Sequence, residues 1–369
     1  MFEEIFGQFS WDRIRDKIYS STEKDFLRVL ACDTPGVDDM HHLFAPAAEA
    51  YLEELARRSL KITRMKFGNT IQLFAPLYIS NECENSCLYC GFNAANNIKR
   101  MTLDDDEVLK EAEIIHSRGF RHILLLTGES RKTVPVQRIA STGKMLHGKF
   151  ASISIEVYPM ETGEYRLMAV SGIDGLTLYQ ETYNRDVYAA VHPAGKKKDF
   201  AWRLNAPDRG GTAGFRKLGI GALLGLADWR VDGFFTALHA MYLAKKYWRS
   251  FIQISFPRIR EAPGSFVPEH TLSDRDLTHL ICAMRIILPE AGFTLSTRES
   301  PLFRDNIIPL GITVMSAGSK TNPGGYSGTK ISDGQFCTAD TRSPIEIAAV
   351  LRNKGFDPVW KDWDRNFCC

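Results

Sequence analysis

Short apolar runs alternate with longer segments of helical character between residues 71 and 318. The runs are nearly continuous in hydrophobic residues, which is typical of strands that are buried on both faces of a parallel sheet. They lie at 71–79, 122–127, 152–158, 174–180, 219–226, 251–256, 293–298 and 311–317. Eight strands that alternate with helices over a segment of this length predict an α/β fold of the (β/α)8 barrel type. An open, doubly wound sheet would give the same pattern.

The segments outside these runs carry the spacing of helices. Residues 1–70 are expected to form an N-terminal helical extension, in which the apolar residues of 45–66 follow a helical stripe. Two pairs on the other side of that helix are spaced one turn apart for ion pairing: Glu53 with Arg57, and Glu54 with Arg58. Further helices are expected at 103–118, 233–249, 273–288 and 344–354. We therefore divide the chain into the extension (1–70), the barrel (71–318), and a C-terminal loop and helix that complete the barrel (319–369).

The composition is that of an ordinary globular protein, with 44% hydrophobic and 24% charged residues. Lys and Arg number 46 against 44 Asp and Glu, so no overall field would attract nucleic acid or an anionic membrane. No apolar run approaches the length of a spanning helix, and the first residues lack the basic and apolar regions of a secretion signal. We therefore expect a cytoplasmic protein that binds neither nucleic acid nor membrane.

Three of the eight cysteines lie directly after the first apolar run, with the spacing C-x3-C-x2-C at Cys83, Cys87 and Cys90. A loop of this length can place three thiolates around one centre. A [4Fe–4S] cluster normally takes four thiolates, so one iron would stay open for an outside ligand such as S-adenosylmethionine (SAM). Zinc or three unrelated cysteines are the alternatives, but neither paired C-x2-C motifs nor nearby histidines accompany the motif. The terminal pair Cys368-Cys369 is expected to be a frayed tail.

Tyr89 gives the motif the form C-x3-C-x-aromatic-C, which is the pattern of the radical SAM superfamily. Within it the chain resembles the tyrosine lyases of bacterial thiazole synthesis over nearly its whole length. The resemblance lies in the order of many stretches: KFGN (66–69), PLYISNECENSCLYCGF (76–92), IKRMTL (98–103), LLLTGE (124–129), YQETY (179–183), RLNAPDR (203–209), GIGALLGLADWRVD (219–232), SFPRIR (255–260), LSTRESPLFRD (295–305), SAGSKTNPGGY (316–326) and PVWKDWD (358–364).

This resemblance implies a radical SAM barrel that cleaves the Cα–Cβ bond of L-tyrosine into 2-iminoacetate (dehydroglycine) and p-cresol. It implies a [4Fe–4S] cluster and SAM as cofactors, with methionine and 5′-deoxyadenosine as by-products and a hydrogen atom taken from the amino group of tyrosine. It also implies a thiazole synthase as protein partner and reduced flavodoxin or ferredoxin as electron donor. A lyase of tryptophan, the tyrosine lyase of [FeFe]-hydrogenase maturation and a non-catalytic iron–sulfur scaffold remain alternatives.

Catalytic groups of such barrels lie at the carboxyl ends of strands, and the residues that the resemblance assigns to SAM fall there. Gly128 and Glu129 would meet its amino group, and Arg203 its carboxylate, for which a guanidinium is a suitable donor. The alternatives are purely structural roles: a turn at the end of the strand for Gly128 and Glu129, and a surface charge on a helix for Arg203. The other SAM-binding candidates are Tyr89 in the cysteine motif, Glu156 at the end of the third strand, Gln180 and Glu181 at the end of the fourth, where relatives bind ribose, and Ile220 and Leu223 beside the adenine.

Arg298, at the end of the seventh run, is the best candidate for binding the substrate. A free amino acid must bury its carboxylate, and a bidentate guanidinium is the natural partner for that group. The alternative is an ion pair of Arg298 with Glu299 or Asp305. Tyr78 and Ser316 resemble groups that hold the amino-acid end of the substrate in related lyases. The three motif cysteines and Arg298 are therefore the expected catalytic residues.

Overall fold

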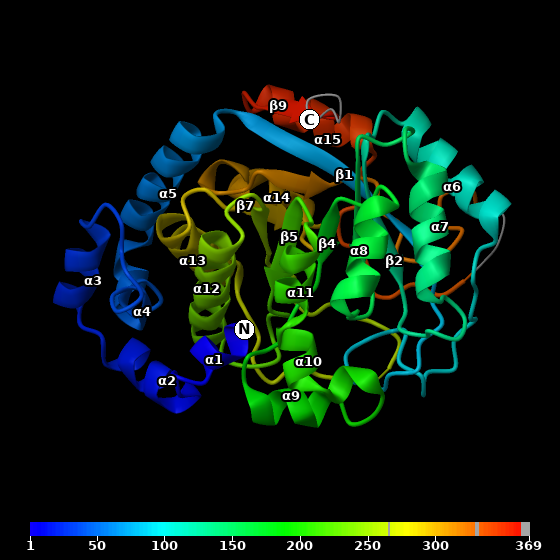
Figure 1. The fold of residues 1–369 in the computed structure, drawn as a ribbon. Helices are drawn as coiled ribbons and strands as arrows, with labels where there is room; N and C mark the ends of the chain where they lie inside the picture. The colour runs from blue at the N-terminus through cyan, green and yellow to red at the C-terminus, as the bar shows by residue number, and fades with distance from the viewer. Residues whose placement is uncertain (265, 329–331, 363–369) are drawn as a thin grey trace.

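The computed structural model describes residues 1–264, 266–328 and 332–362, and these form a closed barrel of eight parallel strands with helices around it (Figure 1). Adjacent strands pair in the order β2-β3-β4-β5-β6-β7-β8-β1, and a further pairing of β1 with β2 closes the ring. The strands are β1 (Thr70–Ser80), β2 (His122–Thr127), β3 (Ser152–Glu156), β4 (Gly175–Thr177), β5 (Lys217–Gly221), β6 (Phe251–Ser255), β7 (Gly292–Leu295) and β8 (Val314–Ser316). The predicted barrel is confirmed, and its closure rules out the open sheet.

The strand bounds differ from the apolar runs mainly at the fifth strand. β5 begins at Lys217, two residues before the predicted run, and ends at Gly221. After it, Ala222 and Leu224 form only isolated bridges, and Gly225 adopts a positive φ of 118° that few other residues tolerate. A ninth strand, β9 (Asp357–Val359), pairs in parallel with the first three residues of β1. The division of the chain at residues 70 and 318 stays a prediction, and Cys368-Cys369 lies outside the described residues.

Helices cover the outside of the barrel and begin where the sequence offers capping side chains. Asp104, Ser273 and Ser343 each accept a hydrogen bond from the backbone N–H three residues later, which stabilises the first turn. The helices are α1 (Phe2–Phe6), α2 (Trp11–Ser20), α3 (Glu23–Leu30), α4 (Met40–Leu43), α5 (Leu52–Phe67), α6 (Asp105–Ser117), α7 (Val136–Leu146), α8 (Thr162–Val170), α9 (Arg185–Val191), α10 (Phe200–Leu204), α11 (Ala206–Ala213), α12 (Trp229–Lys246), α13 (Asp274–Ile287), α14 (Pro301–Ile307) and α15 (Pro344–Asn353), with 3-10 turns at η1 (Pro46–Tyr51), η2 (Lys196–Lys198) and η3 (Ile308–Leu310). No helix of the described part is both long enough and apolar enough to cross a membrane.

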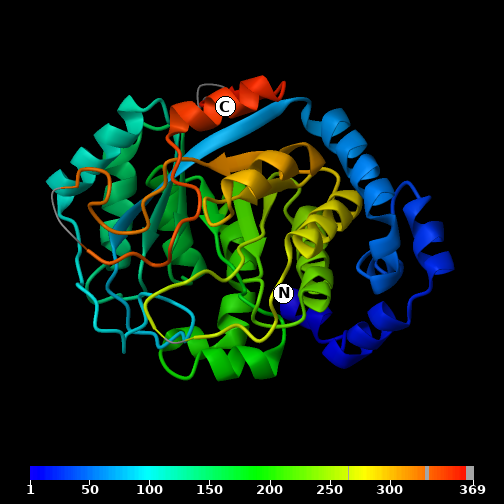
Figure 2. The same ribbon diagram turned by 180° about the vertical axis from the view of Figure 1, so that it is seen from behind.

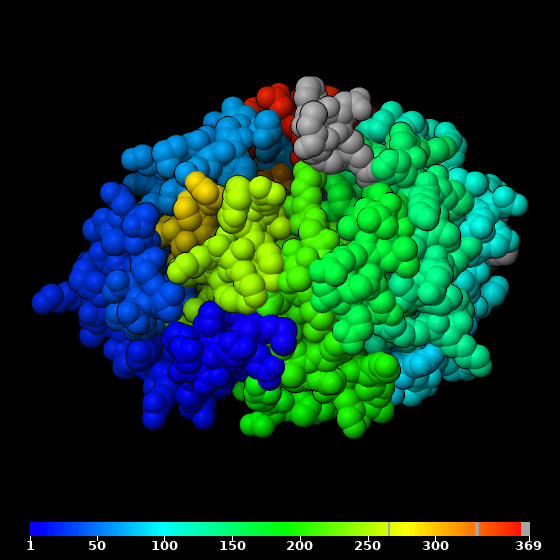
Figure 3. Space-filling model, in the orientation of Figure 1, coloured from blue at the N-terminus to red at the C-terminus, as the bar shows by residue number. Residues whose placement is uncertain are grey.

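The N-terminal extension packs against α12, which is therefore buried on all sides along most of its length. Figure 3 shows the first residues, in dark blue, against the yellow-green segment that contains α12. The ring of Phe2 stacks on His239 with centroids 3.9 Å apart, and Trp11 stacks on Phe235 at 5.8 Å. These contacts explain why α12 lacks a polar face, since one side meets the barrel and another meets the extension.

The helix predicted at 45–66 begins as the 3-10 turn η1 and continues as α5. Of its two predicted ion pairs, Glu53 and Arg57 form one, with Arg57 Nε 3.0 Å from Glu53 Oε1. The other prediction is wrong, because Arg58 donates instead to the backbone carbonyl of Cys32. That carbonyl lies just beyond the end of α3, so the guanidinium satisfies a helix terminus that would otherwise lack a donor.

The interior of the barrel differs from the expected hydrophobic one. All eight strands line an internal cavity with mainly polar side chains, among them Gln72, His122, Ser152, Lys217 and Gln253. The apolar residues between them, such as those of the alternating β3 and β6, point outward to the helices and belong to the hydrophobic core. The strands are thus alternating rather than continuously apolar, because the barrel axis is polar and only the outer layer is an apolar core.

One buried ion pair fixes the wall formed by β7 and β8. Arg304 on α14 and Asp340, both with 0% side-chain exposure, form this pair. Arg304 also donates to the carbonyl of Ser316 at 2.5 Å, and the N–H of Asp340 donates to the carbonyl of Thr297 at 3.1 Å. The pair therefore connects the ends of two strands with the loop that precedes α15.

We expect Asp340→Asn to lower the free energy of unfolding by about 3 kcal/mol or more, because it leaves the Arg304 charge buried without its counter-charge. Urea denaturation measures the change. Glu290→Gln is the matched control, because the Glu290 side chain, 79% exposed, pairs with Lys66 at the surface, and such pairs contribute at most about 1 kcal/mol. Equal losses in the two variants would contradict the role given to the buried pair.

Candidate active site

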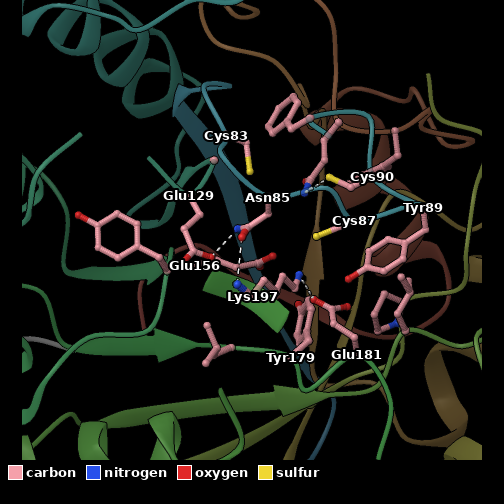
Figure 4. A pocket seen from close by; sticks show the side chains of 18 of the residues that line it. Cys83, Asn85, Cys87, Tyr89, Cys90, Glu129, Glu156, Tyr179, Glu181 and Lys197 are labelled. Carbon is pink, nitrogen blue, oxygen red and sulfur yellow. Dashed lines mark hydrogen bonds and ion pairs between the residues drawn. The ribbon is translucent and has the colours of Figure 1, made fainter. Parts of the chain in front are cut away.

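The loop after β1 brings Cys83, Cys87 and Cys90 to one pocket at the carboxyl ends of the strands. Figure 4 shows the three sulfur atoms, in yellow, turned toward a common space. Cys87 is the most buried at 5% exposure, and burial raises the pKa of its thiol to about 12. Among the described residues no group of three His, Cys, Asp or Glu side chains is spaced to hold a single metal ion.

Asn85, inside the cysteine motif, joins this loop to two other segments. Its Nδ2 donates to Glu129 Oε2 at 2.7 Å, and its Oδ1 accepts from the backbone N–H of Lys197 at 2.9 Å. The segment after α9 approaches so closely that a Cβ on Gly195 would lie 2.2 Å from Asn85 Oδ1. The cysteine loop is therefore seated on the end of β2 and on the segment that carries Lys197. Figure 2, from behind, shows the cyan loop and the green segment of α9 and α10 at the same edge.

Gly128 is the closest contact between β2 and the cysteine loop. Its N–H donates to the carbonyl of Ser80 at 3.0 Å, and the carbonyl of Glu129 accepts from the N–H of Glu84 at 2.9 Å. A Cβ at Gly128 would lie 2.2 Å from the carbonyl oxygen of Glu82, far inside van der Waals contact. Gly128 and Glu129 thus form a strand-end turn that also supports the cysteine loop, and both line the pocket.

Glu181, Lys197 and Arg203 form a buried charge cluster in the same pocket. Glu181 Oε1 accepts from Lys197 Nζ at 2.6 Å and from Arg203 Nη2 at 3.1 Å. Burial alone would raise the pKa of Glu181, but the two cations hold it below its ordinary value. Arg203 is only 7% exposed, so the alternative of a helix-surface charge is wrong. Glu181 is the one non-glycine residue with positive φ (74°) in the described chain, and such backbone strain often marks functional sites.

Tyr89 lies on the other side of this cluster and is held by a histidine. Its hydroxyl lies 2.7 Å from His192 Nε2, and His192 Nδ1 lies 2.8 Å from the carbonyl of Tyr188. Burial lowers the pKa of His192 to about 3, so the ring is neutral. Because the carbonyl can only accept, Nδ1 carries the proton and Nε2 accepts the hydrogen bond from Tyr89. The ammonium of Lys197 lies 5.5 Å from the centre of the Tyr89 ring.

Arg298 lies at the boundary between this pocket and a second one inside the upper barrel. Its guanidinium stacks 3.4 Å from the centre of the Phe336 ring. Neither alternative ion pair forms: Glu299 pairs with Arg258 and Arg260, and Asp305 with Arg342. No carboxylate in the described part of the chain pairs with Arg298, so its charge is available to a ligand.

Tyr78 and Ser316 also line the second pocket, as predicted. The hydroxyl of Tyr78 donates to Gln335 Oε1 at 2.8 Å, and Gln335 Nε2 lies 3.8 Å from the sulfur of Cys90. Ser316 Oγ accepts from the backbone N–H of Thr297 at 3.2 Å. The loop that carries Gln335 therefore connects the second pocket with the cysteine loop.

The two pockets together contain most of the predicted site. The predicted site residues that line one or both pockets are Tyr78, Cys83, Cys87, Tyr89, Cys90, Gly128, Glu129, Glu156, Glu181, Arg203, Leu223, Arg298 and Ser316. Two predicted residues line neither: Gln180 is buried with its amide unpaired among the described groups, and Ile220 lies in the hydrophobic core. The SAM contacts of all these residues stay predictions. The sequence analysis missed Asn85, Tyr179, Lys197, Gln335 and Phe336; only Asn85 carried a usable signal, since it lies inside the cysteine motif.

Comparison with known proteins agrees with this architecture. Residues 77–238 match the family model of the Radical SAM superfamily, and residues 255–357 match that of the Biotin and Thiamin Synthesis associated domain. The barrel and its three-cysteine pocket are therefore those of a radical SAM enzyme, whose cofactors are a [4Fe–4S] cluster and SAM.

The 2-iminoacetate synthases of Escherichia coli (strain K12) and Salmonella typhimurium (strain LT2) are 45% and 44% identical to the chain, over 98% of it and 97% of each relative. The chain belongs to the 2-iminoacetate synthase family.

Solved structures of two other proteins share the fold. The X-ray structure of the FeFe-hydrogenase maturase HydG from Carboxydothermus hydrogenoformans is 32% identical, with a TM-score of 0.90 over 98% of this chain and 86% of that one. The crystal structure of methylornithine synthase (PylB) is 20% identical, with a TM-score of 0.71 over 91% of this chain and 97% of that one. At that identity the second comparison supports the fold alone.

We expect Gly128→Ala to lower the amount of iron bound after anaerobic reconstitution several-fold, because the added Cβ would push the cysteine loop away from β2. Iron content and the visible absorbance of the cluster measure the loss. Gly163→Ala is the control, since Gly163 is a helical residue with nothing within 4 Å of the added Cβ. If both variants bound iron like the wild type, the seating of the loop on Gly128 would be wrong.

Proposed function

We propose that the chain cleaves the Cα–Cβ bond of L-tyrosine into 2-iminoacetate and p-cresol, for the synthesis of the thiazole of thiamine. The observation that carries the proposal is the unpaired guanidinium of Arg298, which lines the pocket of the three thiols. Arg298 is half-buried, and a partly buried cation without a counter-charge is costly, so the carboxylate of an amino acid is a suitable partner. A non-catalytic iron–sulfur scaffold would have no use for such a group.

The residues present fit the two cofactors of this family. Three thiols on one short loop would hold the cluster at Cys83, Cys87 and Cys90. The carboxylate of Glu129 and the guanidinium of Arg203, in the same pocket, would hold the charged methionine end of SAM. Bound together, the reduced cluster and SAM supply the one-electron chemistry that yields methionine and a 5′-deoxyadenosyl radical.

The protein's own side chains would position the substrate beneath that pocket. Arg298 binds its carboxylate, while Tyr78 is held by Gln335 at the side of the second pocket. Aromatic and aliphatic groups form walls that exclude water from the substrate ring: Phe74, Leu124, Leu126 and Phe256. The hydroxyl groups of Tyr179, Ser255 and Thr294 lie where this pocket meets the barrel interior. They suit a phenol better than an indole, which supports tyrosine over tryptophan.

We also propose that a thiazole synthase receives the 2-iminoacetate and that reduced flavodoxin or ferredoxin supplies the electron. The support for both is membership of the 2-iminoacetate synthase family. Because an imine of this kind hydrolyses readily in water, direct transfer to the next enzyme would protect it.

The reconstituted enzyme, given SAM, reductant and L-tyrosine, should form p-cresol and 5′-deoxyadenosine in a tyrosine-dependent manner. Cys87→Ala should abolish both products, because two thiolates cannot hold the cluster. Cys32→Ala, which removes an exposed thiol of the N-terminal extension, should behave like the wild type. Chromatography of the quenched reaction measures both products. Formation of deoxyadenosine without p-cresol, or with tryptophan alone, would refute tyrosine as the substrate.

Arg298→Ala should raise the KM for tyrosine by about 10- to 100-fold, the loss expected when one charge-assisted interaction is removed. The KM for SAM should change much less, since Arg298 lies on the substrate side of the pocket. Steady-state kinetics with each substrate varied separates the two effects. An unchanged KM for tyrosine would mean that the carboxylate binds elsewhere.

A further inference from the structure

Glu156, the last residue of β3, lines both the cysteine pocket and the substrate pocket. Its carboxylate forms no hydrogen bond or ion pair with any described residue. This sets it apart from Glu181 in the same pocket, which is bound by two cations. A half-buried carboxylate without a partner is costly, so its environment favours a cationic ligand.

Arg298 is the matching feature on the opposite wall. It also lines both pockets and also lacks a counter-charge. The two groups interact electrostatically: of all the charged groups near Glu156, Arg298 has the largest effect on the pKa of its carboxyl group. They nevertheless do not form an ion pair, so a space separates two opposite charges. An α-amino acid carries an ammonium and a carboxylate on one carbon and can bridge such a space.

We propose that Glu156 binds the ammonium group of the amino-acid substrate while Arg298 binds its carboxylate. The inference rests on the proposed function and deepens it, and it assigns Glu156 to the substrate in place of SAM. Because Glu156 belongs to both pockets, the bound amino group lies at their boundary. That is where the amino group must be if it is to lose a hydrogen atom to a radical formed beside the three cysteines.

The surroundings of Glu156 make this contact dependent on pH. Burial raises the pKa of Glu156 to about 7, although Arg298 opposes the shift. The other groups that face it keep one charge state between pH 6 and 8. Arg203 and Lys197 remain cationic, Glu181 remains ionised, and Tyr78 and Tyr179 remain neutral, because each pKa is shifted further from this range. Below pH 7 Glu156 takes up a proton and loses the charge that attracts an ammonium, so substrate binding weakens as the pH falls.

The test is a binding measurement on the reconstituted enzyme with SAM but without reductant, so that no turnover occurs. Equilibrium dialysis gives the dissociation constants of L-tyrosine, of 3-(4-hydroxyphenyl)propionate, which lacks the amino group, and of SAM itself. The variants are Glu156→Gln, which keeps the size of the side chain, and Glu113→Gln as control. Glu113 is an exposed carboxylate on α6 that pairs with Lys149 and is not part of either pocket.

We expect Glu156→Gln to weaken tyrosine binding by about 10- to 100-fold, as for other hydrogen bonds to charged groups. Binding of the analogue without an amino group should stay the same or improve, and SAM binding should not change. The fall of tyrosine affinity from pH 8 to pH 6 should disappear in this variant and persist in Glu113→Gln.

Unchanged tyrosine affinity in Glu156→Gln would overturn the proposal, as would a loss confined to SAM binding, which would return Glu156 to the cofactor. Tryptophan is measured in parallel. If the wild type binds tryptophan and not tyrosine, the proposed substrate is wrong, but the same comparison with its desamino analogue, indole-3-propionate, still tests Glu156. If neither amino acid binds to the wild type, both proposals fail.

Discussion

The site depends on the position of β1 in the closed barrel. Its first half pairs with β8 and its second half with β2, so this one strand joins the two ends of the sheet. Parallel strands have all their carboxyl ends on one side, and closure turns that side into a ring. The cysteine loop at the end of β1 can therefore share one pocket with Arg298, more than two hundred residues later in the chain. Without the pairing of β1 with β8, the cysteine loop and Arg298 would lie near opposite edges of an open sheet.

The charged residues of the site fall into two groups: those that pair with one another, and those that have no partner of opposite charge within the protein. The Glu181 carboxylate pairs with both Lys197 and Arg203, which offsets part of the cost of burying these charges. Glu156 and Arg298, which are half-buried, have no such partners. A protein tolerates unpaired charges where a ligand completes them, which supports the proposal that these two groups receive the charges of the substrate. In contrast, the ion pairs of Glu181 with Lys197 and Arg203 hold these side chains in place before a ligand binds. The surrounding contacts also hold the strained backbone of Glu181.

The sequence was informative wherever a residue belongs to a strand end or to a spaced motif. Cys83 and Arg298 were predictable because a barrel places its functional groups at strand ends. Arg203, on α10, was predictable because the order of the motifs resembles a known family. Lys197 was not, since three successive lysines suggest a solvated turn, and only tertiary contacts show that the middle one is largely withdrawn from solvent and pairs with Glu181. Gln335 and Phe336 lie in an irregular loop without periodicity, so their contacts with Cys90 and Arg298 depend on the folded chain alone.

The sequence contains a pattern that indicates a polar barrel interior, although we predicted an apolar one. Ser-Ile-Ser-Ile in β3 and Ile-Gln-Ile-Ser in β6 alternate with a period of two, which a strand buried between two apolar layers would not show. The stabilising apolar contacts must then lie between strands and helices, since the axis offers few. The polar interior continues into the substrate pocket through Tyr179, Ser255 and Thr294. A substrate whose ring ends in a hydroxyl can meet these groups without leaving them unsatisfied, whereas a purely apolar ring end would cost their hydrogen bonds. The polar side chains that leave few apolar contacts along the barrel axis therefore also favour a phenol at the base of the pocket.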